Sequence, residues 1–361
     1  MPKTRVSAIA GGALAFSLIA SAASAQTYEA VHLKTIGPNN GSPNYENIHK
    51  PLFLERLPKL SDGKITADAI SQSEAGIKGP EFFRMAKLGV ADIITATATY
   101  ASGELPMVEG VDLSGLVQDT ETLRKVVDAA LPAMEEMYLE RARVQPLTMW
   151  PTGGQGFWCA TPLNGIDDMA GKKVRVYSSS MADMVESMGG TPVTMAFAEV
   201  VPGLQRKVID CAVTGLNVGN LAKWADVSTH VYPLIVGWSV MSMAANKNSW
   251  ERMPEANRKL IHDQAVNWAA ETGWTQATEQ TQHGVWCSTG DSRCDPDVAA
   301  PKKMGRYNLT LVELTPEDDK KRRELLTEIV LPRFAERCGK ECTEWFNKNI
   351  GPVVGLEAHP K

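Results

Sequence analysis

The spacing of hydrophobic and polar positions changes repeatedly along the chain. Short runs rich in β-branched and apolar residues, bounded by turn residues, predict strands, and apolar residues three and four positions apart predict helices. The predicted strands are 30–35, 64–70, 91–98, 144–150, 157–161, 172–177, 192–195 and 210–216. The predicted helices between them are 44–60, 80–88, 120–139, 181–188 and 198–207. This alternation predicts α/β layers with largely parallel sheets.

Two longer segments follow. Residues 232–245 are uniformly apolar and β-prone, and residues 255–283 show helical spacing without an internal proline. At 1.5 Å per residue this helix would be roughly 43 Å long, which exceeds the width of one small domain. We therefore expect it to cross two domains. A helix beginning at 317–324 and a final helix through Phe346 complete the predicted elements.

The first 25 residues have the pattern of an export signal. Lys3 and Arg5 precede an apolar stretch from Val6 to Ala20, and Ala23-Ser24-Ala25 supplies small residues at the cleavage position. We expect cleavage after Ala25 and a mature protein in the periplasm. An uncleaved anchor helix is the alternative. Past this leader, no apolar run approaches the eighteen residues of a membrane span.

Composition narrows the possible functions. The chain has 361 residues, of which 43% are hydrophobic and 22% charged, with a formal net charge of −5. Such a chain can bury a large core. It has no basic surplus to neutralise a phosphate backbone, so we expect no nucleic-acid partner.

Six cysteines in an exported protein indicate disulfides. By context they form three pairs, although six cysteines allow fifteen connectivities and the sequence alone does not select one. A zinc site is the alternative, since four cysteines lie in the last quarter of the chain. Their spacings are poor for a zinc ribbon, and no histidine is placed to help. The pairs are Cys287 with Cys294, Cys338 with Cys342, and Cys159 with Cys211.

The motifs of exported hydrolases are missing. The chain has no G-x-S-x-G, no H-E-x-x-H and no S-x-x-K followed by K-T-G. Its six histidines are scattered without metal-ligand spacing. Residues 153–156 form a glycine-rich turn that lacks the lysine of a phosphate loop. We expect no catalytic residues, no metal site and no cofactor.

The stretch from Asp168 to Gly215 is the most informative. Residues 168–176 read DMAGKKVRV, residues 189–200 read GGTPVTMAFAEV, and Leu204-Gln205 and Val208-Ile209-Asp210 follow. This pattern closely resembles the DctP-like solute-binding proteins of tripartite ATP-independent periplasmic (TRAP) transporters. The resemblance continues at 246–255, NKNSWERMPE, and at 88–92, LGVAD.

The resemblance implies a two-lobed periplasmic binding (Venus-flytrap) fold of the α/β class, with a long helix lying across both lobes. It implies a signal peptide at 1–25. Lobe I would comprise 26–152 and 240–279, and lobe II would comprise 153–239 and 280–361. Proteins of this family hold a small organic acid in the cleft between the lobes.

Arg175 occupies the arginine position of the family's K-x-R-V motif, which pairs with the ligand carboxylate. A planar, permanently charged guanidinium matches a carboxylate in geometry. Gln155 stands where some members have a second arginine, Thr214 where many have an asparagine, and Phe197 where an aromatic residue lines the pocket. The weaker candidates for ligand contact are Ser178, Trp238 and Trp158. Loss of the second arginine and of the asparagine disfavours heavily hydroxylated sugar acids and dicarboxylates and favours a monocarboxylate. The tryptophans near the cleft suggest that this acid is aromatic or carries a bulky apolar group.

We therefore expect a protein that captures an organic acid and delivers it to the small and large membrane subunits of a TRAP permease. A periplasmic sensor that presents its ligand to a membrane receptor is the alternative. An exported enzyme is a third hypothesis, which no motif supports. The region broken at Cys338 to Cys342 offers no extended helix for dimerisation, so we expect a monomer.

Overall fold

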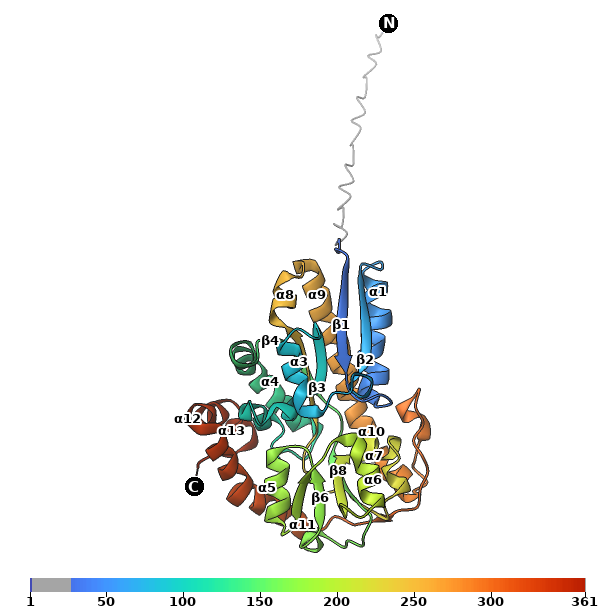
Figure 1. The fold of residues 1–361 in the computed structure, drawn as a ribbon, viewed down its shortest axis with the longest axis vertical. Helices are drawn as coiled ribbons and strands as arrows, with labels where there is room; N and C mark the ends of the chain where they lie inside the picture. The colour runs from blue at the N-terminus through green and yellow to red at the C-terminus, as the bar shows by residue number, and fades with distance from the viewer. Residues whose placement is uncertain (2–26, 361) are drawn as a thin grey trace.

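The computed structural model describes residue 1 and residues 27–360, which form two α/β lobes, each built on a mixed sheet (Figure 1). The two-lobed α/β fold is thus confirmed. Lobe I contains five strands in the order β2-β1-β3-β10-β4: β1 (Val31–Gly37), β2 (Ile65–Ser71), β3 (Ile93–Thr97), β4 (Val144–Pro151) and β10 (Val240–Asn246). Lobe II contains six in the order β11-β9-β5-β8-β6-β7: β5 (Gln155–Cys159), β6 (Lys173–Val176), β7 (Thr191–Thr194), β8 (Cys211–Gly215), β9 (His230–Tyr232) and β11 (Thr310–Leu311).

The expectation of largely parallel sheets is correct for only part of each sheet. In lobe I, β1 pairs in parallel with β2 and β3, while β10 runs antiparallel to both β3 and β4. In lobe II, β6 pairs in parallel with β7 and β8, while β5 runs antiparallel to β8 and β9. The antiparallel strands flank the two strand-to-strand crossings between the lobes, from β4 to β5 and from β9 to β10; the chain passes a third time through the long helix between β10 and β11. A strand that enters a sheet from the other lobe need not follow the βαβ direction.

The uniformly apolar, β-prone segment at 232–245 does not form one continuous strand. β9 ends in lobe II at Tyr232 and β10 begins in lobe I at Val240, so residues 233–239 form a crossing segment. Asp112 holds the end of this segment, because its carboxylate accepts hydrogen bonds from the backbone N–H of Trp238 (2.7 Å) and of Val240 (3.2 Å). The other strand-to-strand crossing is the short connection between β4 and β5.

The predicted long helix is present and longer than expected. It comprises α9 (Glu255–Gln264), a π-helical stretch (Ala265–Ala270) and α10 (Glu271–Thr289). Two glycines allow it to lie against both lobes. A Cβ at Gly273 would collide with the Trp150 ring of lobe I, and one at Gly284 with the backbone at Leu216 of lobe II. In Figure 1, α10 lies where the two lobes meet.

The remaining helices cover the sheets. The C-terminal helices α12 and α13 pack against α4 of lobe I, and α12 also packs against α5 of lobe II. They therefore contact both lobes, whereas the sequence-based division places 280–361 with lobe II. The full set of α-helices outside the long helix is α1 (Leu57–Leu60), α2 (Gln72–Ala75), α3 (Phe82–Lys87), α4 (Thr120–Met137), α5 (Ser179–Ser187), α6 (Val200–Gln205), α7 (Leu216–Leu221), α8 (Lys247–Arg252), α11 (Pro316–Leu325), α12 (Leu331–Asn349) and α13 (Gly351–Val354).

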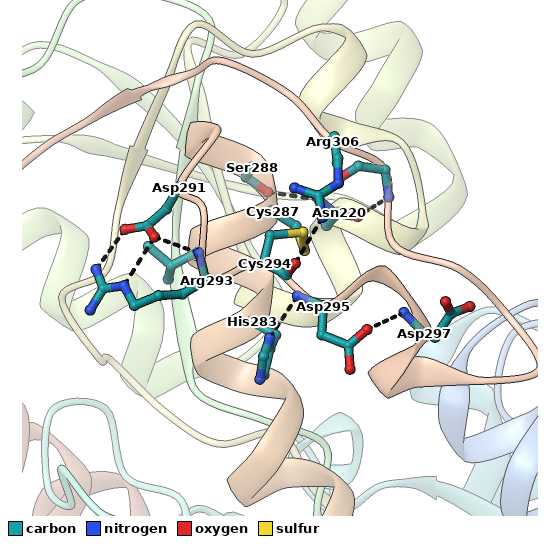
Figure 2. The surroundings of a disulfide bond; sticks show 12 residues. Asn220, His283, Cys287, Ser288, Asp291, Arg293, Cys294, Asp295, Asp297 and Arg306 are labelled. Atoms are coloured by element: carbon teal, nitrogen blue, oxygen red, sulfur yellow. Dashed lines mark hydrogen bonds and ion pairs between the residues drawn. A yellow bond between two sulfur atoms is a disulfide. The ribbon is translucent and has the colours of Figure 1, made fainter.

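All six cysteines form disulfides in the pairs expected from context: Cys159–Cys211, Cys287–Cys294 and Cys338–Cys342. The first joins neighbouring residues of β5 and β8. Figure 2 shows the second, which fastens the segment after α10 to the end of that helix. There the backbone N–H of Asp295 donates to His283 Nδ1 at 3.1 Å. The cysteines therefore staple the chain instead of presenting thiolates to zinc.

Within residues 27–360, no helix is long and apolar enough to cross a membrane. The predicted export signal at 1–25 lies outside the described residues, apart from residue 1.

Candidate functional site

A cavity lies between the lobes at the carboxyl ends of the parallel strands of both sheets. From lobe I it is lined by residues directly after β1 and β2 (Pro38, Gln72) and by the end of β3 (Thr97). From lobe II it is lined by Tyr177, directly after β6, and by Thr214 of β8. Ligand sites in open α/β sheets lie at this edge, because the loops there approach one another. The cavity has a volume of about 70 Å³.

Arg175 is the one charged side chain among the described residues that line the cavity. It is 2% exposed. Its Nε donates to the carbonyl oxygen of Met195 and its Nη1 to that of Val213, both at 2.9 Å. Burial lowers the pKa of this guanidinium from its usual value. No carboxylate forms an ion pair with Arg175 in the described part of the chain, so this buried cation has no protein counter-charge.

Aromatic rings surround the guanidinium. Its Cζ lies 5.1 Å from the centre of the Tyr177 ring and 5.8 Å from the Trp224 ring. The Tyr177 hydroxyl donates to Gln155 Oε1 at 3.1 Å, and Gln155 Nε2 donates to the Gly153 carbonyl at 2.7 Å. Burial raises the pKa of Tyr177 well above its usual range. Tyr177 therefore remains a neutral donor that fixes the Gln155 amide.

Hydroxyl and amide groups from lobe I supply most of the remaining polar surface. Asn44 Nδ2 donates to Thr152 Oγ1 at 2.9 Å, and Asn44 Oδ1 accepts from Trp150 Nε1 at 2.7 Å. Ser239 lies within hydrogen-bond distance of the Thr97 hydroxyl, at 3.2 Å. These bonds orient the neutral groups before any ligand is present. The cavity thus offers one cation and many neutral hydrogen-bonding groups.

Four of the seven residues suggested by the sequence line this cavity: Arg175, Gln155, Phe197 and Thr214. The Phe197 ring packs 5.1 Å from the Trp224 ring. Thr214 pairs with Gly156 of β5, which places it in the middle of the lobe II sheet.

The other three candidates lie elsewhere. Ser178 caps the N-terminus of α5, where its hydroxyl accepts from the Met181 backbone N–H at 3.4 Å, and it lines a neighbouring cavity. Trp238 is buried, with its indole N–H donating to the Val117 carbonyl at 2.9 Å. Trp158 is fully buried in the second hydrophobic cluster of lobe II. The glycine turn next to Trp158 suggested a ligand contact, but the ring packs against Gly219 instead.

The motif at 168–215 gives no indication of the residues that lobe I contributes. These residues come from the ends of strands and from the loops and short helices that follow them, so no single stretch of sequence reveals the group. One sequence signal could have found them. Residues directly after parallel strands meet at one edge of the sheet, so the polar residues that follow the predicted strands of lobe I were candidates for the site. The missed polar and aromatic lining residues are Asn39, Ser42, Asn44, Gln72, Thr97, Tyr100 and Thr152, together with Tyr177 and Ser239.

The described residues contain no group of three or more His, Cys, Asp or Glu side chains placed to hold a metal ion. Two α/β lobes, a chain that passes between them three times and a polar cavity between the lobes are the features of two-lobed solute-binding proteins.

Comparison with known proteins assigns the family. Residues 37–285 match the family described as bacterial extracellular solute-binding protein, family 7 (DctP). The chain belongs to this family, the solute-binding proteins of TRAP transporters. Proteins of this family are solute-binding components of transport systems that work with membrane permease subunits.

Curated relatives include the C4-dicarboxylate-binding periplasmic protein DctP of Rhodobacter capsulatus. The two chains are 26% identical over 298 residues, which is 80% of this chain and 82% of the relative. The sialic acid-binding periplasmic protein SiaP of Vibrio cholerae is 21% identical over 223 residues, covering 61% of this chain and 68% of the relative.

Solved structures share the fold. DctP7 of Bordetella pertussis, a receptor that binds pyroglutamic acid, matches with a TM-score of 0.76 at 20% identity, covering 89% of this chain and 99% of its own. A TRAP solute-binding protein of Desulfovibrio salexigens with bound orotic acid matches with a TM-score of 0.75 at 17% identity, covering 90% and 99%.

Proposed function

We propose that this protein binds a small monocarboxylate between its lobes in the periplasm and delivers it to a TRAP permease. The observation that carries the proposal is Arg175, a buried guanidinium without a protein counter-charge. A guanidinium has five N–H donors, of which this one uses two on backbone carbonyls. A carboxylate that accepts from the remaining donors would supply the missing charge in a paired geometry.

The charge count of the cavity supports a monoanion. No acidic side chain lines it, so an ammonium group on the ligand would find no partner. No second cation lines it either, which disfavours a second carboxylate. A cavity of about 70 Å³ is smaller than an engineered apolar cavity of about 150 Å³ that accepts benzene. The proposal is therefore a compact acid, or a larger one admitted by movement of the lobes.

The neutral lining supports a ligand with hydroxyl or amide groups beside its carboxylate. The two tryptophans that suggested an aromatic body do not line the cavity, whereas Tyr100, Tyr177 and Phe197 do. An aromatic acid would stack on these three rings. We give the hydroxyl- or amide-bearing acid precedence, because neutral polar side chains outnumber the rings.

Binding without turnover is the role we assign to this cavity. The neutral, hydrogen-bonded tyrosine and amide groups are suited to holding a ligand, and the family consists of transport components. The protein would act as a monomer that is recognised by the permease when its lobes close around the ligand.

A thermal-shift screen of the mature protein tests the proposal. The panel contains pyroglutamate, galactonate, orotate and the dicarboxylate succinate, each at increasing concentration. A ligand at a thousand times its dissociation constant adds about 4 kcal/mol, which raises the Tm by several degrees. We expect a shift with a monocarboxylate and little with succinate. No shift with any acid, or a shift confined to succinate, would contradict the proposal.

Variants of Arg175 then test the anchor. We expect Arg175→Ala to weaken binding of the acid found by at least 100-fold and Arg175→Lys by at least tenfold, because lysine lacks the paired geometry. Arg206→Ala is the matched control. This arginine is exposed, forms no ion pair in the described residues and does not line the cavity. Calorimetric titration measures all three. Full affinity in Arg175→Ala would remove the role of Arg175.

A further inference from the structure

A second cavity of about 470 Å³ lies beside the ligand cavity and shares Tyr100 and Tyr177 with it. Its walls come from α3 and residues 100–105 of lobe I and from the start of α5 in lobe II. The two shared rings meet edge to face, with their centres 6.0 Å apart. This pair of tyrosines therefore separates a roomy outer cavity from the small inner one that contains Arg175.

The outer cavity is basic although the chain is acidic overall. Four basic side chains line it (Arg84, Lys87, Arg141 and Arg337) against two acidic ones (Glu104 and Asp183). The whole chain has a formal net charge of −5. The sign of the charge at this cavity is thus opposite to that of the protein.

Neighbouring charges neutralise only part of this set. Arg337 donates to Asp183 at 2.5 Å and to the buried Glu109 at 3.2 Å, so its charge is balanced within the protein. Arg141 lies 3.4 Å from the exposed Glu341.

The positive excess resides on α3. Arg84 and Lys87 are exposed and form no ion pair in the described residues. The Lys87 ammonium donates to the Arg141 carbonyl at 3.3 Å, which orients it without neutralising it. Two cations without an ion-pair partner therefore stand at one wall of the cavity, and Glu104 is the one lining acid that is also unpaired in the described residues.

We propose that the outer cavity is an anion-collecting vestibule, which concentrates small carboxylates through Arg84 and Lys87 and passes them between Tyr100 and Tyr177 to Arg175. Low-dielectric walls of one charge sign focus the field and raise the association rate of an oppositely charged ligand by tenfold or more. The vestibule rests on the proposed function for the identity of its anion. Its electrostatics are independent of that identity.

A single engineered thiol measures the local potential without any ligand. Because all six native cysteines are paired, a new cysteine is the one free thiol of the described chain. Thr194→Cys places it in the vestibule and Thr214→Cys places it in the inner cavity. The probes are an anionic methanethiosulfonate (sulfonatoethyl) and a cationic one (trimethylammonioethyl). The quantity measured is the rate of the anionic reagent divided by the rate of the cationic reagent at the protein thiol. Dividing this ratio by the same ratio for the free thiol 2-mercaptoethanol gives the local electrostatic potential.

Charge reversal on α3 gives the decisive comparison. In the Thr194→Cys protein, we expect Arg84→Glu with Lys87→Glu to lower the anion-to-cation ratio at least tenfold, and 0.5 M salt to shrink the effect. In the Thr214→Cys protein, we expect the same reversal to slow the anionic reagent several-fold. The matched control is Lys59→Glu with Lys64→Glu, exposed lysines near α1 with no ion pair in the described residues, which should change either ratio less than twofold. Circular dichroism and Tm verify that each variant folds.

Each result is decisive. No change at Thr194→Cys, or a change no larger than that of the lysine control, would overturn the proposed potential. A change at Thr194→Cys without one at Thr214→Cys would overturn the route to the inner cavity. If the vestibule responds as expected while Arg175→Ala keeps full affinity for the acid, the ligand anchor fails and the vestibule stands. The two proposals are therefore distinguished.

Discussion

At the scale of single residues, Arg175 and Asp112 are two buried charged groups with different surroundings. Arg175 faces a cavity and has no counter-charge among the described residues, whereas Asp112 accepts hydrogen bonds from the backbone of the crossing segment. Burial of an ion is costly unless hydrogen bonds or a partner charge offset it. This difference supports the proposed role of Arg175 as the ligand anchor, whereas Asp112 holds the connection between the lobes.

Asp112 makes stability depend on pH in a defined direction. Burial raises the pKa of its carboxyl group from 3.8 to about 7, against the hydrogen bonds that favour the charged form. The native state then binds the proton more tightly than the unfolded state. The stabilising contribution is fully present below about pH 4 and is lost as the pH rises through 7. The contribution of Asp112 to the free energy of unfolding is at most about 4 kcal/mol, because a pKa difference of about three corresponds to about 1.36 kcal/mol for each unit.

Urea unfolding of the wild type and of Asp112→Asn at pH 4 and pH 8 measures this. We expect the free energy of unfolding of the wild type, relative to that of the variant, to fall by several kcal/mol between the two pH values. The comparison with the variant is needed because His49 acts in the opposite direction. Burial lowers the pKa of His49 to about 3, so its contribution is lost as the pH falls below 6.5. A difference that stays constant with pH would contradict the assignment to Asp112.

The sequence could predict only the part of the cavity that a continuous motif encodes. Arg175, Phe197 and Thr214 all fall within one 48-residue stretch, 168–215, and all three line the cavity. Tyr100 and Asn44 come from separate short helices of the other lobe, and their meeting depends on strand order. Trp158 and Trp238 show the converse, because closeness to a glycine turn or a crossing says nothing about which way a ring points.

At the scale of elements, local pattern predicted most strands and helices but not their pairing. The alternation at β1 and the β-prone run at β3, which is buried along its whole length, predicted strands, and both strands are present. The interruption of the segment 232–245 is obscured in the sequence because the crossing segment is as apolar as the strands beside it. Most of it is buried between the two lobes, and its turn signals are Pro233, directly after β9, together with Gly237 and Ser239.

The long helix gives the sharpest prediction at this scale. Gly284→Ala should destabilise the protein by about 2 kcal/mol or more, because the new Cβ would meet the rigid backbone at Leu216 and force α10 away from α7. This outweighs the gain of about 1 kcal/mol that alanine usually brings to a helix. The Tm and the free energy of unfolding in urea measure the change.

Gly203→Ala in α6 is the matched control for this substitution. Its Cβ would lie 3.2 Å from the flexible thioether of Met195, which can move aside. We expect a change within about 1 kcal/mol of zero there. Equal effects of the two substitutions would mean that the close approach of α10 to lobe II contributes nothing specific.

At the scale of the whole molecule, the lobes share one hydrophobic core. A single cluster of buried side chains includes Ile93 and Met243 of the lobe I sheet together with Phe157 and Val174 of the lobe II sheet. The long helix and both strand-to-strand crossings run beside it. Lobe II also has a smaller cluster of its own, around Trp158. Whether the lobes unfold together depends on which of these two clusters dominates.

We expect the shared cluster to dominate, so that the lobes unfold in one cooperative transition although chains of this size often unfold in steps. Tryptophan fluorescence and far-ultraviolet circular dichroism should give the same midpoint in urea. Gly284→Ala, which loosens α10 from lobe II, should separate the two midpoints or lower the slope of the transition. Two resolved transitions in the wild type would show that lobe II unfolds on its own cluster. The lobes would then be joined only by their crossings, and closure around a ligand would be the main coupling between them.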